Sequence, residues 1–154
     1  MSMDDILSTV RAFDGALELA PGPGSDAPPL TWGDHFFYFA PDGVLPPGQP
    51  YATVVTKDYP DDTSSRLDAR GRWRVNVHVG RERFVQLLGH DPRAVPDDVD
   101  HARADVLLPH PLYAVQGWVA VVTPGAATLP TVRELLREAH EQARVRWGRR
   151  PRPH

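Results

Sequence analysis

The segment between residues 73 and 79 has the most regular pattern in this sequence. Its apolar and polar residues alternate strictly: Trp73, Val75, Val77 and Val79 alternate with Arg74, Asn76 and His78. Because successive side chains of a β-strand point to opposite faces of a sheet, this alternation predicts a strand with one buried face and one solvated face. Gly80 follows the pattern and ends it.

Three other apolar segments predict further strands, at residues 36–40, 51–56 and 117–123. The first of them is a continuous aromatic run, which suits a strand within a sheet. Clusters of proline and glycine separate the segments and indicate turns. Residues 57–71 are polar and too long for a tight hairpin, so we interpret them as a candidate functional loop.

Helices are predicted at both ends of the chain. Ser2 is the expected cap of the first helix, and acidic residues follow it in the first turn. Apolar residues then continue at helical spacing as far as Phe13. Thr131 and Glu134 have the spacing of a capping box at the start of the last helix. A third, short helix is expected directly after the strand at 73–79, with Gly89 as its left-handed cap.

Together these elements predict an α+β fold with a mainly antiparallel sheet, helices packed on one face and terminal helices at both ends. A parallel, doubly wound sheet is the alternative, but it needs a helix after most strands, and only one strand here has one. The length of 154 residues suits a single domain, expected at 1–148. Residues 149–154 are rich in arginine and proline, and we expect a flexible tail there.

Composition excludes several functions. The chain has no cysteine, which excludes disulfides, thiolate metal sites and a cysteine nucleophile. Its first residues lack the apolar run of a signal peptide, and no segment reaches the length of a membrane span, so we expect a cytoplasmic protein without membrane contact.

Charge is distributed unevenly along the chain. Residues 1–62 hold ten of the 20 acidic residues against only Arg11 and Lys57, whereas residues 63–154 hold 15 arginines against the other ten acids. The net charge is nevertheless −3, and nucleic-acid-binding domains carry an excess of positive charge. The composition therefore disfavours a nucleic-acid partner.

The candidate site residues lie at strand ends and on the polar side of the strand at 73–79. Lys57, the only lysine, stands beside Asp58 and could bind an anion or take part in proton transfer; the alternative is an exposed lysine with a weak ion pair. Asn76 and His78 point the same way and could line a cleft with Lys57, or could form the wet face of the sheet.

Two further residues complete the candidate set. Asp34 could face a pocket or belong to the turn that begins at Gly33, and His110 before Pro111 could be a base or a structural hydrogen-bond partner. No metal-ligand spacing, phosphate-binding glycine loop or nucleophile elbow is present, so we expect no cofactor and no metal. A histidine and aspartate site assembled from distant segments stays open as an alternative.

Several short motifs together resemble a known family. They are Trp32-Gly33-Asp34 with Phe36-Phe37, Thr56-Lys57-Asp58, the pair Asn76 and Gly80, His110-Pro111, Gly117-Trp118-Val119 and Glu138-Ala139-His140. This set resembles a small bacterial family of unknown function, which is in turn similar to the MmcQ/YjbR-like domains. The resemblance covers roughly residues 30–145. His78 departs from it, since a small residue is expected there.

The resemblance implies an α+β fold with an antiparallel sheet and implies no reaction. The wider group has been linked to DNA binding by fold analogy, which the scarcity of basic residues before position 63 counts against here.

Two classes of function remain. The first is a non-enzymatic module that binds a small anionic or carbonyl-bearing ligand or a protein partner, as a monomer or homodimer. The second is a small cofactor-independent enzyme for proton transfer or hydrolysis that uses Lys57, Asp58 and a histidine. A closed pocket with two ionisable groups of opposed pKa shifts would favour the enzyme, and a shallow or wet surface would favour the binding module. We favour the binding module, because no nucleophile or cofactor motif is present.

Overall fold

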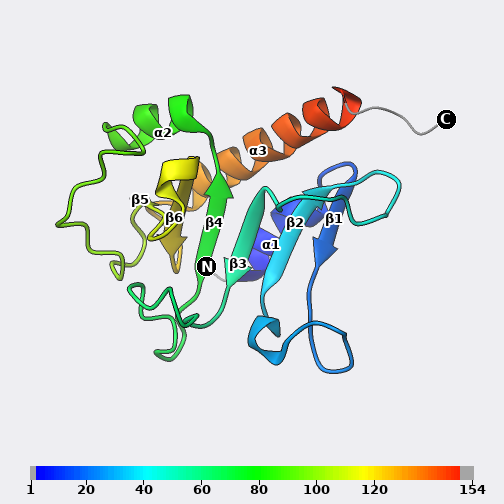
Figure 1. Ribbon diagram of the computed structural model, residues 1–154, viewed down its shortest axis with the longest axis horizontal. Helices are drawn as coiled ribbons and strands as arrows, with labels where there is room; N and C mark the ends of the chain where they lie inside the picture. Colours follow the sequence, from blue (N-terminus) through cyan, green and yellow to red (C-terminus); the bar gives the residue numbers. More distant parts are fainter. Residues whose placement is uncertain (1–2, 150–154) are drawn as a thin grey trace.

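The computed structural model describes residues 3–149, and its centre is one antiparallel sheet (Figure 1). The four expected strands are present: β2 (His35–Phe39), β3 (Ala52–Val55), β4 (Arg74–His78) and β6 (Trp118–Val122). Two short strands that we did not predict, β1 (Ala16–Leu19) and β5 (Leu108–Pro109), form its edges. The order is β1-β2-β3-β4-β6-β5, and every neighbouring pair is antiparallel. The predicted α+β class is confirmed, and the parallel alternative is wrong.

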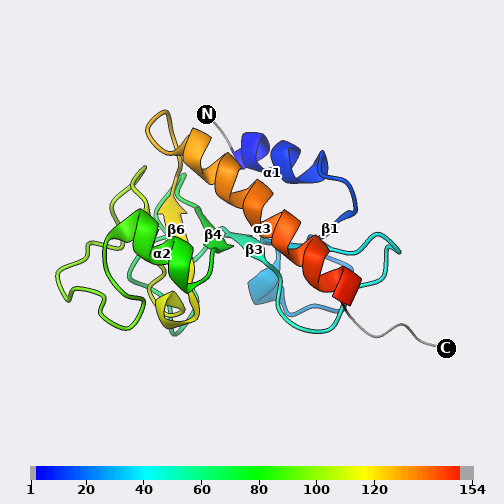
Figure 2. The same cartoon turned by 90° about the horizontal axis from the view of Figure 1, so that it is seen from above.

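The helices are α1 (Met3–Arg11), α2 (Arg81–Leu88) and α3 (Leu129–Arg149), and two 3-10 turns, η1 (Pro29–Thr31) and η2 (Ala114–Gln116), lie in loops. Figures 1 and 2 show α1 and α3 on the same face of the sheet. Gly89 ends α2 with φ 80° and ψ 8°, the left-handed cap that the sequence predicts. No helix within residues 3–149 is long and apolar enough to cross a membrane.

The main core lies between the sheet and the terminal helices. Val75 and Val77 of β4 and Val119 and Val121 of β6 point into it, as the alternation predicts. From α3, Val132, Leu135, Leu136 and Ala139 complete the same core. These four residues form the buried side of the last helix. Arg149 is the last residue of α3, and residues 150–154 of the expected tail lie outside the described part of the chain.

The N-terminus of α3 differs from the prediction. The helix begins at Leu129, two residues before Thr131, so Thr131 and Glu134 do not form a capping box there. Asp105 from the preceding loop caps the helix instead: its Oδ1 accepts hydrogen bonds from the backbone N–H groups of Gly125 and Thr128 at 2.8 and 3.1 Å. The expected cap of the first helix, at Ser2, lies outside the described residues.

The second face of β4 is also buried, which the alternation does not predict. Arg74 and Asn76 are each only 2% exposed. The loop after β3 covers this face: its Leu67 packs with Val55 and Val122, while Tyr59 lies against the same small cluster. The expectation of a wet face at Asn76 is therefore wrong, because a loop folds over it.

Candidate functional site

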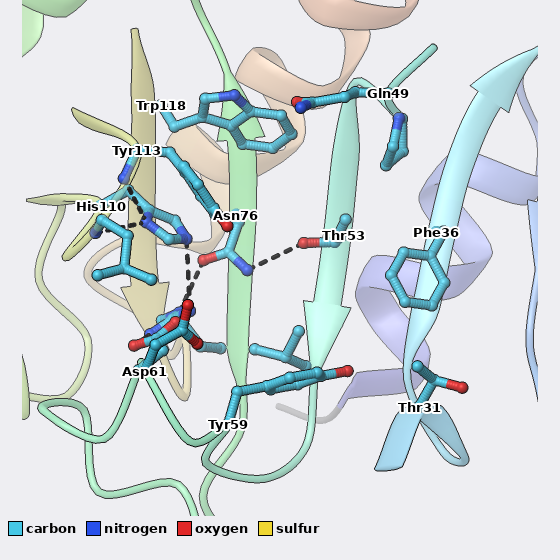
Figure 3. Close-up of a pocket in the computed structure, with 15 residues that line it drawn as sticks. Thr31, Phe36, Gln49, Thr53, Tyr59, Asp61, Asn76, His110, Tyr113 and Trp118 are labelled. Carbon is cyan, nitrogen blue, oxygen red and sulfur yellow. Dashed lines mark hydrogen bonds and ion pairs between the residues drawn. The ribbon is translucent and has the colours of Figure 1, made fainter. Parts of the chain in front are cut away.

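A cavity of about 310 Å³ lies on the sheet face opposite α1 and α3 (Figure 3). Strands β2, β3, β4 and β6 form its floor, and the loops that follow β3 and β5 form its walls. Four aromatic side chains surround the central pair of Asn76 and Thr53, namely Phe36, Tyr59, Tyr113 and Trp118. The site is therefore a hollow with aromatic walls and a polar floor.

Arg74 is the centre of a buried polar network at one end of this floor. Its Nη1 and Nη2 donate to the two carboxylate oxygens of Asp62 at 3.1 and 2.6 Å, and Nη1 also donates to Ser65 Oγ at 3.0 Å. Burial alone would raise the pKa of Asp62, but the hydrogen bonds and charge of Arg74 hold that pKa below its usual value. The pair is thus a charge-neutral, fully bonded element of the floor.

Arg74 also connects the two central strands. Its Nε donates to Asn76 Oδ1 at 2.8 Å, and Asn76 Nδ2 in turn donates to Thr53 Oγ1 on β3 at 2.9 Å. Thr53 and Asn76 are direct partners in the antiparallel register of β3 and β4, which brings their side chains together on one face. The network therefore sets the amide orientation of Asn76 beneath the cavity.

His110 closes the network on the side of β5. Its Nδ1 accepts hydrogen bonds from the backbone N–H groups of Leu112 and Tyr113, both at 3.0 Å. A neutral imidazole has one acceptor nitrogen and one N–H, so the proton belongs on Nε2, and Nε2 lies 3.4 Å from Arg74 Nη2. Burial, followed by the charge of Arg74, lowers the pKa of His110 well below its usual value. The imidazole is neutral at pH 7 and presents a donor.

Lys57 and Asp34 form a second buried cluster. Asp34 is 0% exposed, and its Oδ1 accepts from Thr56 N, Thr56 Oγ1 and Lys57 Nζ at 2.8, 2.8 and 2.9 Å. Lys57 Nζ also donates to the carbonyl oxygen of Trp32 at 2.7 Å. Lys57 is therefore partly buried rather than exposed, and its ion-pair partner is fully buried; the strength of the pair stays a prediction.

Tyr59 joins this second cluster to the cavity. Its hydroxyl donates to Asp34 Oδ2, and its ring lines the cavity. Burial, followed by the hydrogen bond to Asp34, raises the pKa of Tyr59. The Lys57 and Asp34 pair thus holds the ring of Tyr59 in position through its hydroxyl, although neither member of the pair lines the cavity.

Asp58 and His78 occupy other positions. Asp58 Oδ1 accepts from Leu67 N at 2.7 Å, and Asp58 N donates to Asp68 Oδ1 at 2.9 Å, so this residue organises the loop after β3. His78 Nε2 lies 2.9 Å from the carbonyl oxygen of Gln116, and its ring meets Trp118. Burial lowers the pKa of His78. Neither residue lines the cavity.

The structure therefore brings together two of the six candidate residues, Asn76 and His110, in one cavity. It adds several that sequence reasoning missed, above all Arg74 and Asp62. The one sequence feature that could have indicated this network is Arg74 itself, an arginine within a predicted strand. If a loop covers that face of the sheet, a buried arginine needs an acidic partner. Nothing local indicates Asp62, which lies twelve residues earlier in a loop. No group of three or more potential metal ligands occurs among residues 3–149.

This geometry defines a small α+β domain with a ligand-sized cavity on the helix-free face of its sheet. The chain belongs to a family of unknown function, DUF6194, whose sequence model matches residues 1–152. No curated protein and no solved structure matched the chain. The expected membership of a family without an assigned function is confirmed, and the more distant similarity to MmcQ/YjbR-like domains stays a prediction.

Proposed function

We propose that this protein is a non-enzymatic small-molecule-binding domain and that its ligand occupies the cavity over Asn76 and Thr53. The observation that carries the proposal is the combination of aromatic walls with a few convergent polar groups in a hollow of about 310 Å³. Sites for small molecules have this composition: mostly apolar surfaces for affinity, with a few fixed polar atoms for orientation. The buried network under the floor holds those polar atoms in place before a ligand arrives.

The contacts of the ionisable groups favour a binding domain over the alternative, a small cofactor-independent enzyme. A general base has to accept a proton near neutral pH, but burial keeps His110 neutral and its Nδ1 already accepts two backbone hydrogen bonds. Both oxygens of Asp62 are bonded to Arg74. The enzyme hypothesis relies on Lys57 and Asp58, but both lie outside the cavity. Lys57 is bonded to Asp34, and Asp58 is bonded to the backbone of its own loop.

The test is a thermal-shift screen of a metabolite library with two variants of the same loop. Tyr113 is 45% exposed and lines the cavity, while Val115 is 62% exposed and does not. Compounds that raise the melting temperature of the wild-type protein should lose that effect in Tyr113→Ala and keep it in Val115→Ala. Hits that bind Tyr113→Ala as well as wild type would place the site elsewhere, and turnover of a hit would favour the enzyme.

A further inference from the structure

Several polar groups on the cavity floor have donor protons to spare. His110 offers Nε2–H, because its Nδ1 accepts from the backbone. Arg74 Nη2 approaches the same nitrogen to 3.4 Å and is itself a donor. Two N–H groups cannot bond to each other, and among residues 3–149 no hydrogen bond from His110 Nε2–H to an acceptor is present.

Thr53 supplies a second donor. Its Oγ1 accepts the hydrogen bond from Asn76 Nδ2 at 2.9 Å, so its own hydroxyl proton points elsewhere. Within residues 3–149 this hydroxyl accepts a hydrogen bond and donates none. A molecule seated over the floor therefore meets a hydroxyl donor from β3 and an imidazole donor from the loop after β5, and it needs acceptor atoms to match them.

The charge of the cavity argues against an anionic ligand. Three ionised residues line it: Arg74 with a positive charge, and Asp61 and Asp62 with negative charges. Arg74 is already neutralised by its two-point contact with Asp62, so Asp61 leaves the lining with an excess of negative charge. A ligand carboxylate would lose its hydration and gain no unpaired cation in return.

The walls favour a flat ring. Phe36, Tyr59, Tyr113 and Trp118 stand around the floor in Figure 3. Aromatic faces gain most from planar partners that stack or meet them edge to face. The ring of Tyr113 already packs on His110, with centroids 4.9 Å apart, and thereby extends the wall down to the donor end of the floor.

We propose that the ligand of this cavity is a flat, uncharged ring compound whose carbonyl oxygen accepts hydrogen bonds from His110 Nε2–H and Arg74 Nη2–H, and that a second acceptor atom of the same molecule accepts from Thr53 Oγ1–H. This proposal rests on the proposed function, since it names the chemical class that the same cavity takes. Of the two ligand types expected from the sequence, it selects the carbonyl-bearing one over the anionic one.

Three probes with one carbon skeleton test the proposal in NMR titrations at pH 7.4. 2-Naphthamide is flat and uncharged, 2-naphthoate is flat and anionic, and decahydronaphthalene-2-carboxamide is uncharged but not flat. The naphthamide should bind about tenfold tighter than either of the others, because the naphthoate brings an unpaired charge and the saturated amide loses the aromatic contacts with the walls. It should also shift the ring Nε2–H signal of His110.

Two variants of Thr53 examine the second donor. The probe for this test is 6-methoxy-2-naphthamide, whose ether oxygen supplies a second acceptor. Thr53→Ser keeps the hydroxyl and should keep the affinity for this probe within about twofold, whereas Thr53→Val removes the hydroxyl and should weaken binding about three- to tenfold. Chemical denaturation of both variants checks that they are folded. Equal affinities of the two folded variants would remove Thr53 from the site.

The outcomes separate the two proposals. Tight binding of 2-naphthoate at the cavity residues would overturn the ligand class and leave a binding domain in place. A ring-nitrogen spectrum that puts the proton of His110 on Nδ1 would overturn the donor arrangement regardless of any ligand. If none of the three probes shifts signals from cavity residues at millimolar concentration, the ligand class fails; the binding function fails as well only if the thermal-shift screen also finds no compound whose effect depends on Tyr113.

Discussion

Arg74 Nε donates a hydrogen bond to Asn76 Oδ1 over 2.8 Å, and both residues lie buried on the helix-free face of β4. Residues two apart on a strand point the same way, so the strand itself brings the guanidinium to the amide. The arginine then reaches Asp62 and Ser65 in the loop after β3. One charged side chain thus holds the loop onto the sheet and orients the amide under the cavity.

Replacing Arg74 with methionine should lower the free energy of unfolding by about 3–5 kcal/mol, because Asp62 would remain buried without its cation. Urea denaturation measures the loss. The double variant Arg74→Met with Asp62→Leu should regain most of it, since no unpaired charge is left. Equal losses in the single and double variants would show that the isolated charge is not the cause.

The matched control is Arg81→Met. Arg81 Nη2 lies 2.6 Å from Asp91 Oδ2, the same separation as in the Arg74 and Asp62 pair, but the arginine side chain is 76% exposed. We expect a loss of less than about 1 kcal/mol there, because water and salt screen an exposed pair.

Leu136→Ala in α3 should lower the free energy of unfolding by about 2–5 kcal/mol, because Leu136 is fully buried between the helix and the sheet. Val145→Ala, in the same helix but 38% exposed, should change it by less than about 0.5 kcal/mol. Guanidinium denaturation of both variants tests the packing of the terminal helix. Similar losses at the two positions would contradict it.

The fold could be predicted as far as its signals are local. Three patterns depend only on their own segment: the alternation at 73–79, the aromatic run at 36–39 and Gly89. The structure has a strand at each of the first two and a left-handed helix cap at the third. The edge strands β1 and β5 have four and two residues, too few for a visible period. The start of α3 was predicted wrongly because its capping carboxylate, Asp105, lies more than twenty residues before the helix.

The site could be predicted only in part for the same reason. Asn76 and His110 attract attention as polar residues near apolar segments, but their meeting point depends on how two long loops fold over the sheet. Lys57 stood out as the only lysine, and its partner Asp34 lies 23 residues away. Asp62 and Arg74 pair across twelve residues of loop. Such contacts arise from tertiary packing and leave no spacing in the sequence to read.

Lys57→Met should lower the free energy of unfolding by about 2–4 kcal/mol, because it leaves the carboxylate of Asp34 buried without a cation. Lys57→Arg should recover part of the loss through its charge. Thermal and urea unfolding measure both variants. A loss within about 0.5 kcal/mol for Lys57→Met would restore the interpretation of Lys57 as a weakly paired residue available to a ligand.

Stability should fall between pH 7 and pH 5 because of His110. Burial lowers its folded pKa below the value of about 6.5 in an unfolded chain, so protons bind the unfolded state preferentially. The stability is therefore fully present above pH 6.5 and is lost as the pH falls below it, at up to about 1.4 kcal/mol per pH unit for one such group. Arg74 and His101 face the ring and oppose its protonation, while Asp62 favours it.

His110→Gln tests this by comparing slopes rather than absolute stabilities. The loss of unfolding free energy between pH 7 and pH 5 should be about 1–2 kcal/mol smaller in the variant than in wild type. His78 and His101, whose pKa values burial also lowers, should supply the remaining slope. Parallel pH profiles for the two proteins would mean that His110 has the same pKa in the folded and unfolded states.

The last prediction concerns the cap of α3. Asp105 has φ 56°, a left-handed conformation that asparagine tolerates better than alanine, and its carboxylate bonds to Gly125 N, Ala127 N and Thr128. Asp105→Asn should therefore lower the free energy of unfolding by about 1 kcal/mol, through the weaker acceptor at Oδ1 and the loss of the bond from Ala127 N, which an NH2 group cannot accept. Asp105→Ala should lower it by about 2–3 kcal/mol, because the cap is lost and the backbone is strained as well. Asp105→Gly removes the strain but not the loss of the cap, so it should fall between the two. Urea denaturation of the three variants measures these losses, and amide hydrogen exchange at Gly125 and Thr128 measures the protection that the cap provides. Equal losses for alanine and glycine would contradict the contribution of backbone strain. Unchanged exchange at Thr128 would contradict the contribution of the cap.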